Sequence, residues 1–340
     1  MEWDIPDGWV RLRTVDAHAE GEPLRVILEG FPIPEGDTVL ARRRDAGERL
    51  DELRRALMLE PRGHADMYGC LVMPPVTEGA DLSVLFLHNE GFSTMCGHGI
   101  IALTTVLLEI GLHPANGSRT ALAIDTPAGL VRATGHVREG RVEEVRFRNV
   151  PSFAMELDRE VQVRGVGAVT LDLAFGGAFY AFVDAGSLGI PLVPERVGEL
   201  IEVGRAIKRA VAAETEIEHP EDHELGFLYG TIFTGPAEAP GRHSRHVCVF
   251  ADGEVDRSPT GTGVSARLAI LRARGEIGLD EEIEIESVIG SRFSGRIAGE
   301  ARVGPHAGVI PEIGGRAFIT GRHEFLLDPR DPWREGFLIR

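Results

Sequence analysis

A cysteine and a threonine occupy matching places in two glycine-containing segments of this sequence. Residues 94–99 read TMCGHG and residues 258–263 read SPTGTG, so glycine follows both Cys96 and Thr260 at the first and third positions. A hydroxyl residue also precedes each of them by two positions, and the two segments lie roughly half the chain apart. An ionised thiol is a base or a nucleophile. The pairing predicts a thiol that faces a hydroxyl across a cleft between two similar halves.

Each segment has a strand-like run before it and a helix-like run after it. The strand-like runs are residues 82–87 and 247–251, and the helix-like runs are residues 100–110 and 264–272. A helix that begins after a glycine turn presents free backbone N–H groups, which suit a carboxylate. The same position lowers the pKa of a cysteine. Two such elements predict two helix starts aimed at one ligand, although either alone is also compatible with a packing turn.

Three side chains in and beside these segments are candidates for chemistry. Cys96 is predicted to be catalytic because it lies at a helix start, the alternative being a small buried hydrophobic residue. Asp256, four residues before Thr260, could accept from an ammonium group or simply stabilise a turn. His98 could orient the ligand or cap the helix. The other two cysteines, Cys70 and Cys248, lie in strand-like runs and are predicted to be core residues.

Composition and charge narrow the class of protein. The net charge of −17 argues against binding to nucleic acid or to an anionic membrane surface. Three scattered cysteines do not form a disulfide framework, and the histidines lack zinc-ligand spacing, so no metal is expected. The acidic N-terminus has no apolar run behind it, and no apolar stretch is long enough to span a membrane. We expect a reduced, cytoplasmic protein that binds a small molecule.

Alternating apolar residues and frequent turns indicate an α+β fold with two sheet-rich domains. Helical spacing predicts helices over residues 43–57 and 201–212. A hairpin turn is expected at 135–140, an exposed acidic loop at 214–224, and a strand at 317–321 that returns to the first domain. The predicted first domain comprises residues 1–130 plus roughly 317–340 and carries Cys96. The second, residues 131–316, carries Asp256 and Thr260.

The sequence resembles the proline racemase family over nearly its whole length. The motifs that carry the resemblance are MCGHG at 95–99 and DRSPTGTG at 256–263, supported by GEPLRV at 21–26, RGHADMYG at 62–69 and the tail from 319 to 329. The resemblance implies a diaminopimelate-epimerase-like fold: two pseudo-symmetric domains, each with sheet around a central helix, and an active site in the cleft between them. It also implies no cofactor and a homodimer.

Racemases of this family use two cysteines on opposite faces of the substrate Cα, and this sequence departs from them at the second position. Cys96 matches the first cysteine, but Thr260 replaces the other. A threonine hydroxyl is too weak an acid to act as a matching base without an activating partner. One-base deprotonation followed by elimination is then the expected outcome. The branch of the family with threonine here is similar to enzymes that dehydrate trans-3-hydroxy-L-proline to Δ1-pyrroline-2-carboxylate.

The resemblance assigns roles to the motif residues. Cys96 as thiolate takes the Cα proton, and backbone N–H groups around Gly97, His98, Gly261 and Thr262 hold the carboxylate. Asp256 and His98 hold the ring nitrogen, and Thr260 lines the opposite face or bonds the substrate. The acid that protonates the departing hydroxyl is left open between the Cys96 thiol, His98 and water.

Two other functions remain open on the sequence alone. The first is an isomerase, a 4-hydroxyproline 2-epimerase or proline racemase in which Thr260 or water serves as an inefficient second acid. The second is a binding protein that keeps the cleft without turnover. Retention of Cys96 argues against the second, because binding an amino acid has no need of a thiol.

Overall fold

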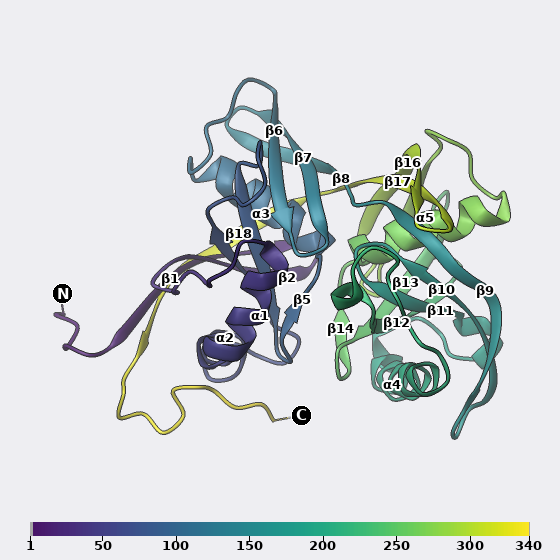
Figure 1. The fold of residues 1–340 in the computed structure, drawn as a ribbon, viewed down its shortest axis with the longest axis horizontal. Helices are drawn as coiled ribbons and strands as arrows, with labels where there is room; N and C mark the ends of the chain where they lie inside the picture. The colour runs from purple at the N-terminus through teal and green to yellow at the C-terminus, as the bar shows by residue number, and fades with distance from the viewer. Residues whose placement is uncertain (1–2, 340) are drawn as a thin grey trace.

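The computed structural model describes residues 3–339, which form two lobes that lie side by side (Figure 1). We call the strands β1–β8 and β18 with helices α1–α3 the first lobe, and strands β9–β17 with helices α4 and α5 the second lobe. Residues 1, 2 and 340, which belong to the predicted first domain, lie outside the described range.

The elements of the first lobe include the strand and helix expected around Cys96. Its strands are β1 (Val10–Ala19), β2 (Glu22–Glu29), β3 (Tyr68–Met73), β4 (Leu82–His88), β5 (Phe92–Ser93), β6 (Arg119–Thr126), β7 (Gly129–Arg138), β8 (Arg141–Arg148) and β18 (Ala317–Leu327). Its helices are α1 (Val39–Arg49), α2 (Asp51–Met58) and α3 (Gly97–Glu109). The single helix predicted over 43–57 is wrong, because the chain forms two helices that part at Leu50.

The second lobe likewise contains the strand and helix expected around Thr260. Its strands are β9 (Ser152–Val163), β10 (Gly167–Phe175), β11 (Phe179–Asp184), β12 (Leu228–Gly235), β13 (Ser244–Phe250), β14 (Glu254–Asp256), β15 (Glu282–Glu286), β16 (Arg292–Val303) and β17 (His306–Gly315). Its helices are α4 (Val197–Glu214), which confirms the helix expected at 201–212, and α5 (Gly261–Arg274). The acidic segment after α4 is irregular apart from a short 3₁₀ turn at His223–Leu225.

Each lobe contains one helix that is buried along most of its length. Every residue of α3 from Gly97 to Leu108 is buried, because the helix packs against β1, β2, β7, β8 and β18. Helix α5 is packed in the same way against β9, β10, β16 and β17. Burial on all sides explains why neither helix shows the one-sided apolar stripe of a surface helix. Both are therefore fixed in position from their first residues.

Strand pairing connects the two lobes. Strand β17 of the second lobe pairs antiparallel with β8 of the first, so the sheet runs from one lobe into the other. The predicted return strand is confirmed, since β18 pairs antiparallel with β1 along its whole length. Residues 135–138 belong to β7, and the hairpin turn is confined to 139–140. The boundary expected between residues 130 and 131 falls inside β7, which pairs with both β6 and β8.

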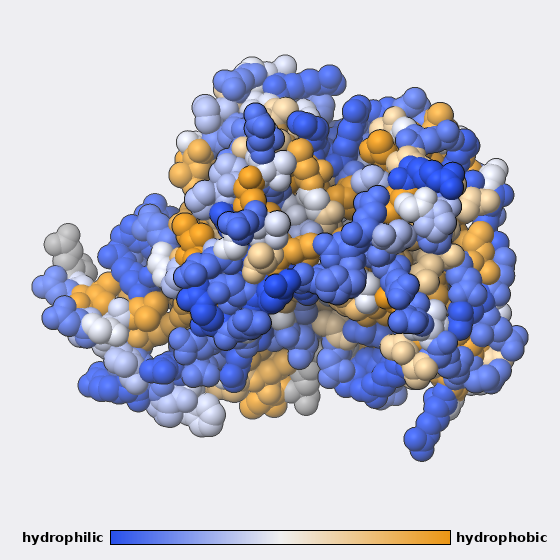
Figure 2. All heavy atoms as spheres, in the orientation of Figure 1, coloured by the Kyte–Doolittle hydropathy of each residue, from blue (hydrophilic) through white to orange (hydrophobic). Residues whose placement is uncertain are grey.

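Hydrophilic side chains cover most of the face seen in Figure 2, with smaller hydrophobic patches between them. This agrees with the net charge of −17. None of the helices within residues 3–339 is both long and apolar enough to cross a membrane.

Candidate active site

Cys96 is the residue that immediately precedes α3. Its backbone is extended, and its sulfur accepts a hydrogen bond from the Gly99 amide at 3.2 Å, so the side chain itself caps the helix. Gly99 has to be glycine, because a Cβ there would lie 2.5 Å from Cε1 of Phe86 and 3.0 Å from the sulfur. The thiol is therefore held against the first turn of the helix and is only 4% exposed.

Thr260 precedes α5 in the same way but in an unusual backbone conformation. Its φ of 66° and ψ of 97° lie in a region that β-branched residues rarely adopt, and such strain concentrates at functional sites. Its Oγ1 atom is buried and has no hydrogen-bond partner among residues 3–339. The hydroxyl nevertheless lies near enough to Cys248 to favour the ionised form of that thiol. The strained threonine therefore lines the pocket with its hydroxyl beside the Cys248 thiol.

The N-termini of α3 and α5 meet between the lobes. A Cβ at Gly97 would lie 2.5 Å from the Cα of Gly261, so the two backbones touch through their glycines. The first amides of a helix have no intrahelical acceptor, and both helix dipoles present their positive ends here. Two such ends in contact form a strong site for one carboxylate.

His98 links the thiol to a carboxylate of the other lobe. Its Nδ1 atom is 3.2 Å from the Cys96 sulfur and 4.0 Å from Oδ2 of Asp256. Burial lowers the pKa of His98 to about 4, although the charge of Asp256 opposes this shift. His98 is therefore neutral near pH 7 and able to accept a proton from the thiol.

The structure corrects the expectation that the helix start lowers the pKa of Cys96. Burial raises the pKa of this thiol well above its usual value, and the charges of Asp256 and Glu22 raise it further. The Gly99 amide and the Tyr68 hydroxyl lower it, but they do not offset the loss of solvation. With His98 also neutral, the pair is a thiol and an imidazole at neutral pH.

Buried contacts between the lobes hold Asp256 and its surroundings in place. Asp256 accepts from the Ser258 amide at 2.7 Å, and Glu22 of the first lobe accepts from the Arg257 amide at 2.7 Å. Burial, together with the nearby charge of Asp256, raises the pKa of Glu22 well above its usual value. A second cross-lobe pair joins Nδ1 of His88 to Glu254 at 3.1 Å.

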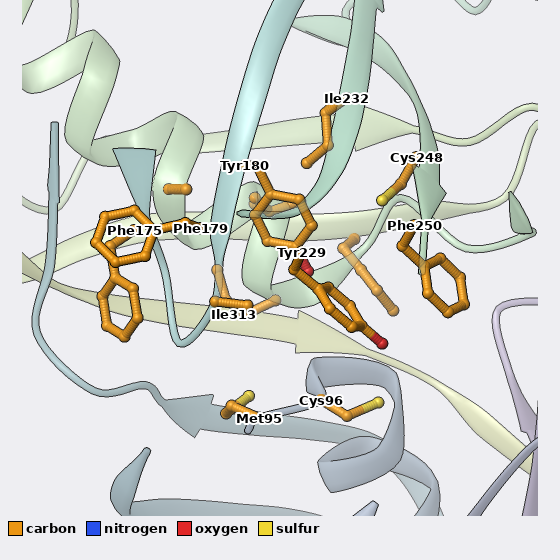
Figure 3. Packing of buried hydrophobic residues seen from close by; sticks show 14 of the residues in the cluster. Met95, Cys96, Phe175, Phe179, Tyr180, Tyr229, Ile232, Cys248, Phe250 and Ile313 are labelled. Carbon is orange, nitrogen blue, oxygen red and sulfur yellow. The ribbon is translucent and has the colours of Figure 1, made fainter. Parts of the chain in front are cut away.

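All seven residues predicted from the sequence line one narrow pocket between the lobes, with a cavity volume of about 20 Å³. The set comprises Cys96, Gly97, His98, Asp256, Thr260, Gly261 and Thr262. Figure 3 shows Cys96 and Met95 on one side of this space and Tyr180, Tyr229, Phe250 and Cys248 on the other. A larger, more open groove along residues 215–228 contains none of the predicted residues.

Six further residues that were not predicted from the sequence line the pocket. They are Tyr68, Met95, Tyr180, Tyr229, Cys248 and Phe250. Three of the six are all the tyrosines of the chain. Each tyrosine lies within an apolar strand, and a buried hydroxyl in such a run requires a polar partner, which is a signal the sequence offered. Cys70 is a core residue as expected, whereas Cys248 is buried but also faces the pocket.

The residues that the structure describes contain no cluster of three or more His, Cys, Asp or Glu side chains able to hold a metal ion. The anion site formed by the helix starts and the aromatic wall instead suit a small organic acid.

Comparison with known proteins agrees with this arrangement. The family model described as proline racemase matches residues 14–338. A trans-3-hydroxy-L-proline dehydratase of Colwellia psychrerythraea is 45% identical, over 98% of this chain and 94% of its own. The human trans-3-hydroxy-L-proline dehydratase is also 45% identical, over 97% and 95%.

A solved structure shows a similar fold over the same extent. The hydroxyproline epimerase of Agrobacterium vitis with bound trans-4-hydroxy-L-proline superposes with a TM-score of 0.92. It is 34% identical and covers 97% of this chain and 96% of its own. The match of the family model and the relatives over nearly the full length shows that the chain belongs to the proline racemase family.

Proposed function

We propose that the protein dehydrates trans-3-hydroxy-L-proline to Δ1-pyrroline-2-carboxylate. The observation that carries this proposal is the pairing of Cys96 with Thr260 at the two helix starts that face one pocket. The dehydratases are 45% identical to this chain, against 34% for the epimerase of known structure, which supports the same choice.

The substrate carboxylate binds between the N-termini of α3 and α5, on the backbone N–H groups around Gly97, His98, Gly261 and Thr262. These groups also stabilise the negative charge that develops on the carboxylate when the Cα proton leaves. The ring nitrogen lies beside Asp256 and His98, where its positive charge offsets the carboxylate of Asp256. The substrate carboxylate then faces N–H donors, and the ring ammonium faces the carboxylate of Asp256.

Cys96 is the base. Its proton passes to Nδ1 of His98, 3.2 Å away, and the imidazolium that forms is stabilised by the charge of Asp256, which raises the pKa of His98. The thiolate then takes the Cα proton.

Elimination needs no base on the second side of the ring. In trans-3-hydroxy-L-proline the C3 hydroxyl lies on the same ring face as the Cα hydrogen, so both leave toward Cys96. The product enamine tautomerises to the imine, and no proton has to reach Cα from the far face. Thr260 lines that face. Its hydroxyl is too weak an acid to exchange protons there, and the elimination does not need it to.

The wider setting follows from the same residues. We propose two pseudo-symmetric halves of the diaminopimelate-epimerase type with α3 and α5 as central helices, and a boundary near residues 149–151, after β8. The reaction needs no cofactor, because Cys96, His98 and the helix starts supply base and anion site. The protein is a homodimer in the reducing cytoplasm, where Cys96 stays a free thiol.

An isomerase is the second candidate, and the Cys248 thiol in the second-lobe wall of the pocket favours it. Burial, together with the charge of Asp256, raises the pKa of Cys248 well above its usual value, so it is a proton donor rather than a base. An enzyme of this kind would invert Cα of proline or 4-hydroxyproline and incorporate one solvent deuterium. Loss of that inversion in Cys248→Ala, with dehydration absent from the wild type, would identify it.

A parallel assay tests the proposal. Purified protein is incubated with trans-3-hydroxy-L-proline, trans-4-hydroxy-L-proline and L-proline, and the cyclic imine is trapped with o-aminobenzaldehyde. We expect imine from the first compound only, and none with Cys96→Ser. Absence of imine at high enzyme concentration, or full activity of Cys96→Ser, would overturn the proposal.

A further inference from the structure

The three tyrosines of the pocket have different partners. The Tyr180 hydroxyl bonds Oγ1 of Thr262 at 2.7 Å, in the first turn of α5 where the carboxylate is held. The Tyr68 hydroxyl lies 2.6 Å from Oγ of Ser93 and 3.3 Å from the hydroxyl of Tyr229. Tyr68 and Tyr229 therefore form a separate hydroxyl cluster, contributed by β3 and β12.

Tyr68 belongs to the same side of the pocket as the base. Its ring packs edge-on against the ring of His98, with centroids 4.7 Å apart, and His98 is in turn 3.2 Å from the Cys96 sulfur. The Tyr68 hydroxyl also acts as a hydrogen-bond donor that lowers the pKa of Cys96, against the stronger effect of burial. Tyr68 thus lines the pocket on the side of the thiol, where the Cα hydrogen and the C3 hydroxyl must both leave.

We propose that the Tyr68 hydroxyl is the general acid that protonates the departing C3 hydroxyl, with Ser93 and Tyr229 orienting it. This inference rests on the proposed dehydration.

The proton transfers balance without an outside reagent. Cys96 thiolate takes the Cα proton, the electrons of that bond form the Cα–C3 double bond, and the C3–O bond breaks. The leaving oxygen takes the proton of Tyr68 and departs as water. The Tyr68 phenolate then takes a proton from the Cys96 thiol, and His98 returns its proton to Cys96, which restores all three groups. The hydrogen removed from Cα thereby ends on the Tyr68 hydroxyl, in place of the proton that left with the water.

A phenol is well suited to this step. Hydroxide is a poor leaving group, and a phenol is a much stronger acid than water, so a phenol can protonate the leaving oxygen. Burial raises the pKa of Tyr68 well above its usual value, which keeps it protonated until hydroxide forms beside it. Cys96 is engaged with the Cα proton at that moment, and Nδ1 of His98 faces the sulfur.

The test compares two leaving groups in one enzyme. Wild type and Tyr68→Phe are assayed with trans-3-hydroxy-L-proline and trans-3-fluoro-L-proline, because fluoride leaves without protonation by a strong acid. The measured quantity is the ratio of kcat/KM for the fluoro compound to that for the hydroxy compound. A change in Cys96 acidity or in packing slows both and leaves this ratio constant.

We expect Tyr68→Phe to raise the ratio by roughly 10²- to 10⁴-fold, the size of a general-acid contribution. Tyr180→Phe, which removes a hydroxyl from the carboxylate site instead, is expected to slow both compounds equally. If wild type does not release fluoride, hydrogen exchange at Cα of L-proline replaces it as the acid-independent reaction. Far-UV circular dichroism and melting temperature check that each variant is folded.

An unchanged ratio in Tyr68→Phe would overturn the assignment, whether both reactions fall together or neither does. A rise of the same size in Tyr180→Phe would overturn it as well. Failure of the proposed function is a different result, in which wild type forms no imine from the hydroxy compound.

Discussion

Replacing Gly97 by alanine tests the contact between the two helix starts. The added Cβ would lie 2.5 Å from Cα of Gly261, 3.0 Å from its carbonyl carbon and 3.1 Å from Cζ of Phe147. Carbon atoms in contact are normally about 3.5–4.0 Å apart, so α3 and α5 must separate by about 1 Å. Because the nearest obstacle is backbone, no side-chain rotation relieves the overlap.

The effect on stability is expected to be small and the effect on activity large. Overpacking of this kind costs about 1–3 kcal/mol, and the helix preference of alanine over glycine offsets up to about 1 kcal/mol of it. A displacement of about 1 Å between groups that hold one substrate lowers the rate by about 10²-fold. We therefore expect kcat/KM for dehydration to fall about 10²-fold, with a loss of about 1–2 kcal/mol in the free energy of unfolding.

Gly198→Ala is the matched control. Gly198 lies in the first turn of α4, and a Cβ there meets no atom within 4 Å. Dehydration by this variant should equal that of wild type, and its stability should be unchanged or higher. Both variants are measured by imine trapping and urea denaturation. Wild-type kcat/KM in Gly97→Ala would refute the view that the two helix starts must touch to hold the carboxylate.

Three further outcomes follow from the site. The value of kcat/KM should be flat just above neutrality, because the raised pKa of Cys96 keeps it a thiol in the free enzyme and its proton passes to His98 within the site; a rise between pH 7 and pH 9 would contradict this. Since the pKa of His98 is about 4 when folded and 6.5 when unfolded, the folded state binds fewer protons, and stability should fall as the pH drops through this window. The loss is about 3 kcal/mol relative to His98→Gln, measured by urea denaturation at each pH. Thr260→Cys should gain inversion at Cα of L-proline with uptake of solvent deuterium, because it adds a second acid and removes a β-branched residue from a φ of 66°; product without inversion would count against it.

The local elements around the site could be predicted because their signals are local. Alternating and continuous apolar runs indicated β4 and β13, and the glycines after Cys96 and Thr260 indicated where α3 and α5 begin. The long helix predicted over 43–57 failed for a tertiary reason. The guanidinium of Arg54 in α2 is buried and donates to the His88 carbonyl at 2.7 Å, a contact with a distant strand that no local pattern encodes.

The sequence by itself determined which residues lie at the two helix starts, because a strand, a glycine turn and a helix place Cys96 and Thr260 in equivalent positions whatever surrounds them. Only the tertiary structure decided their chemical state. The pKa of Cys96 depends on Asp256 and on burial, which arise from the opposite lobe and from packing rather than from neighbours in sequence. The same packing brings Tyr68 and Tyr229 to within 3.3 Å of each other in one pocket, a contact between strands of different lobes that no local pattern encodes.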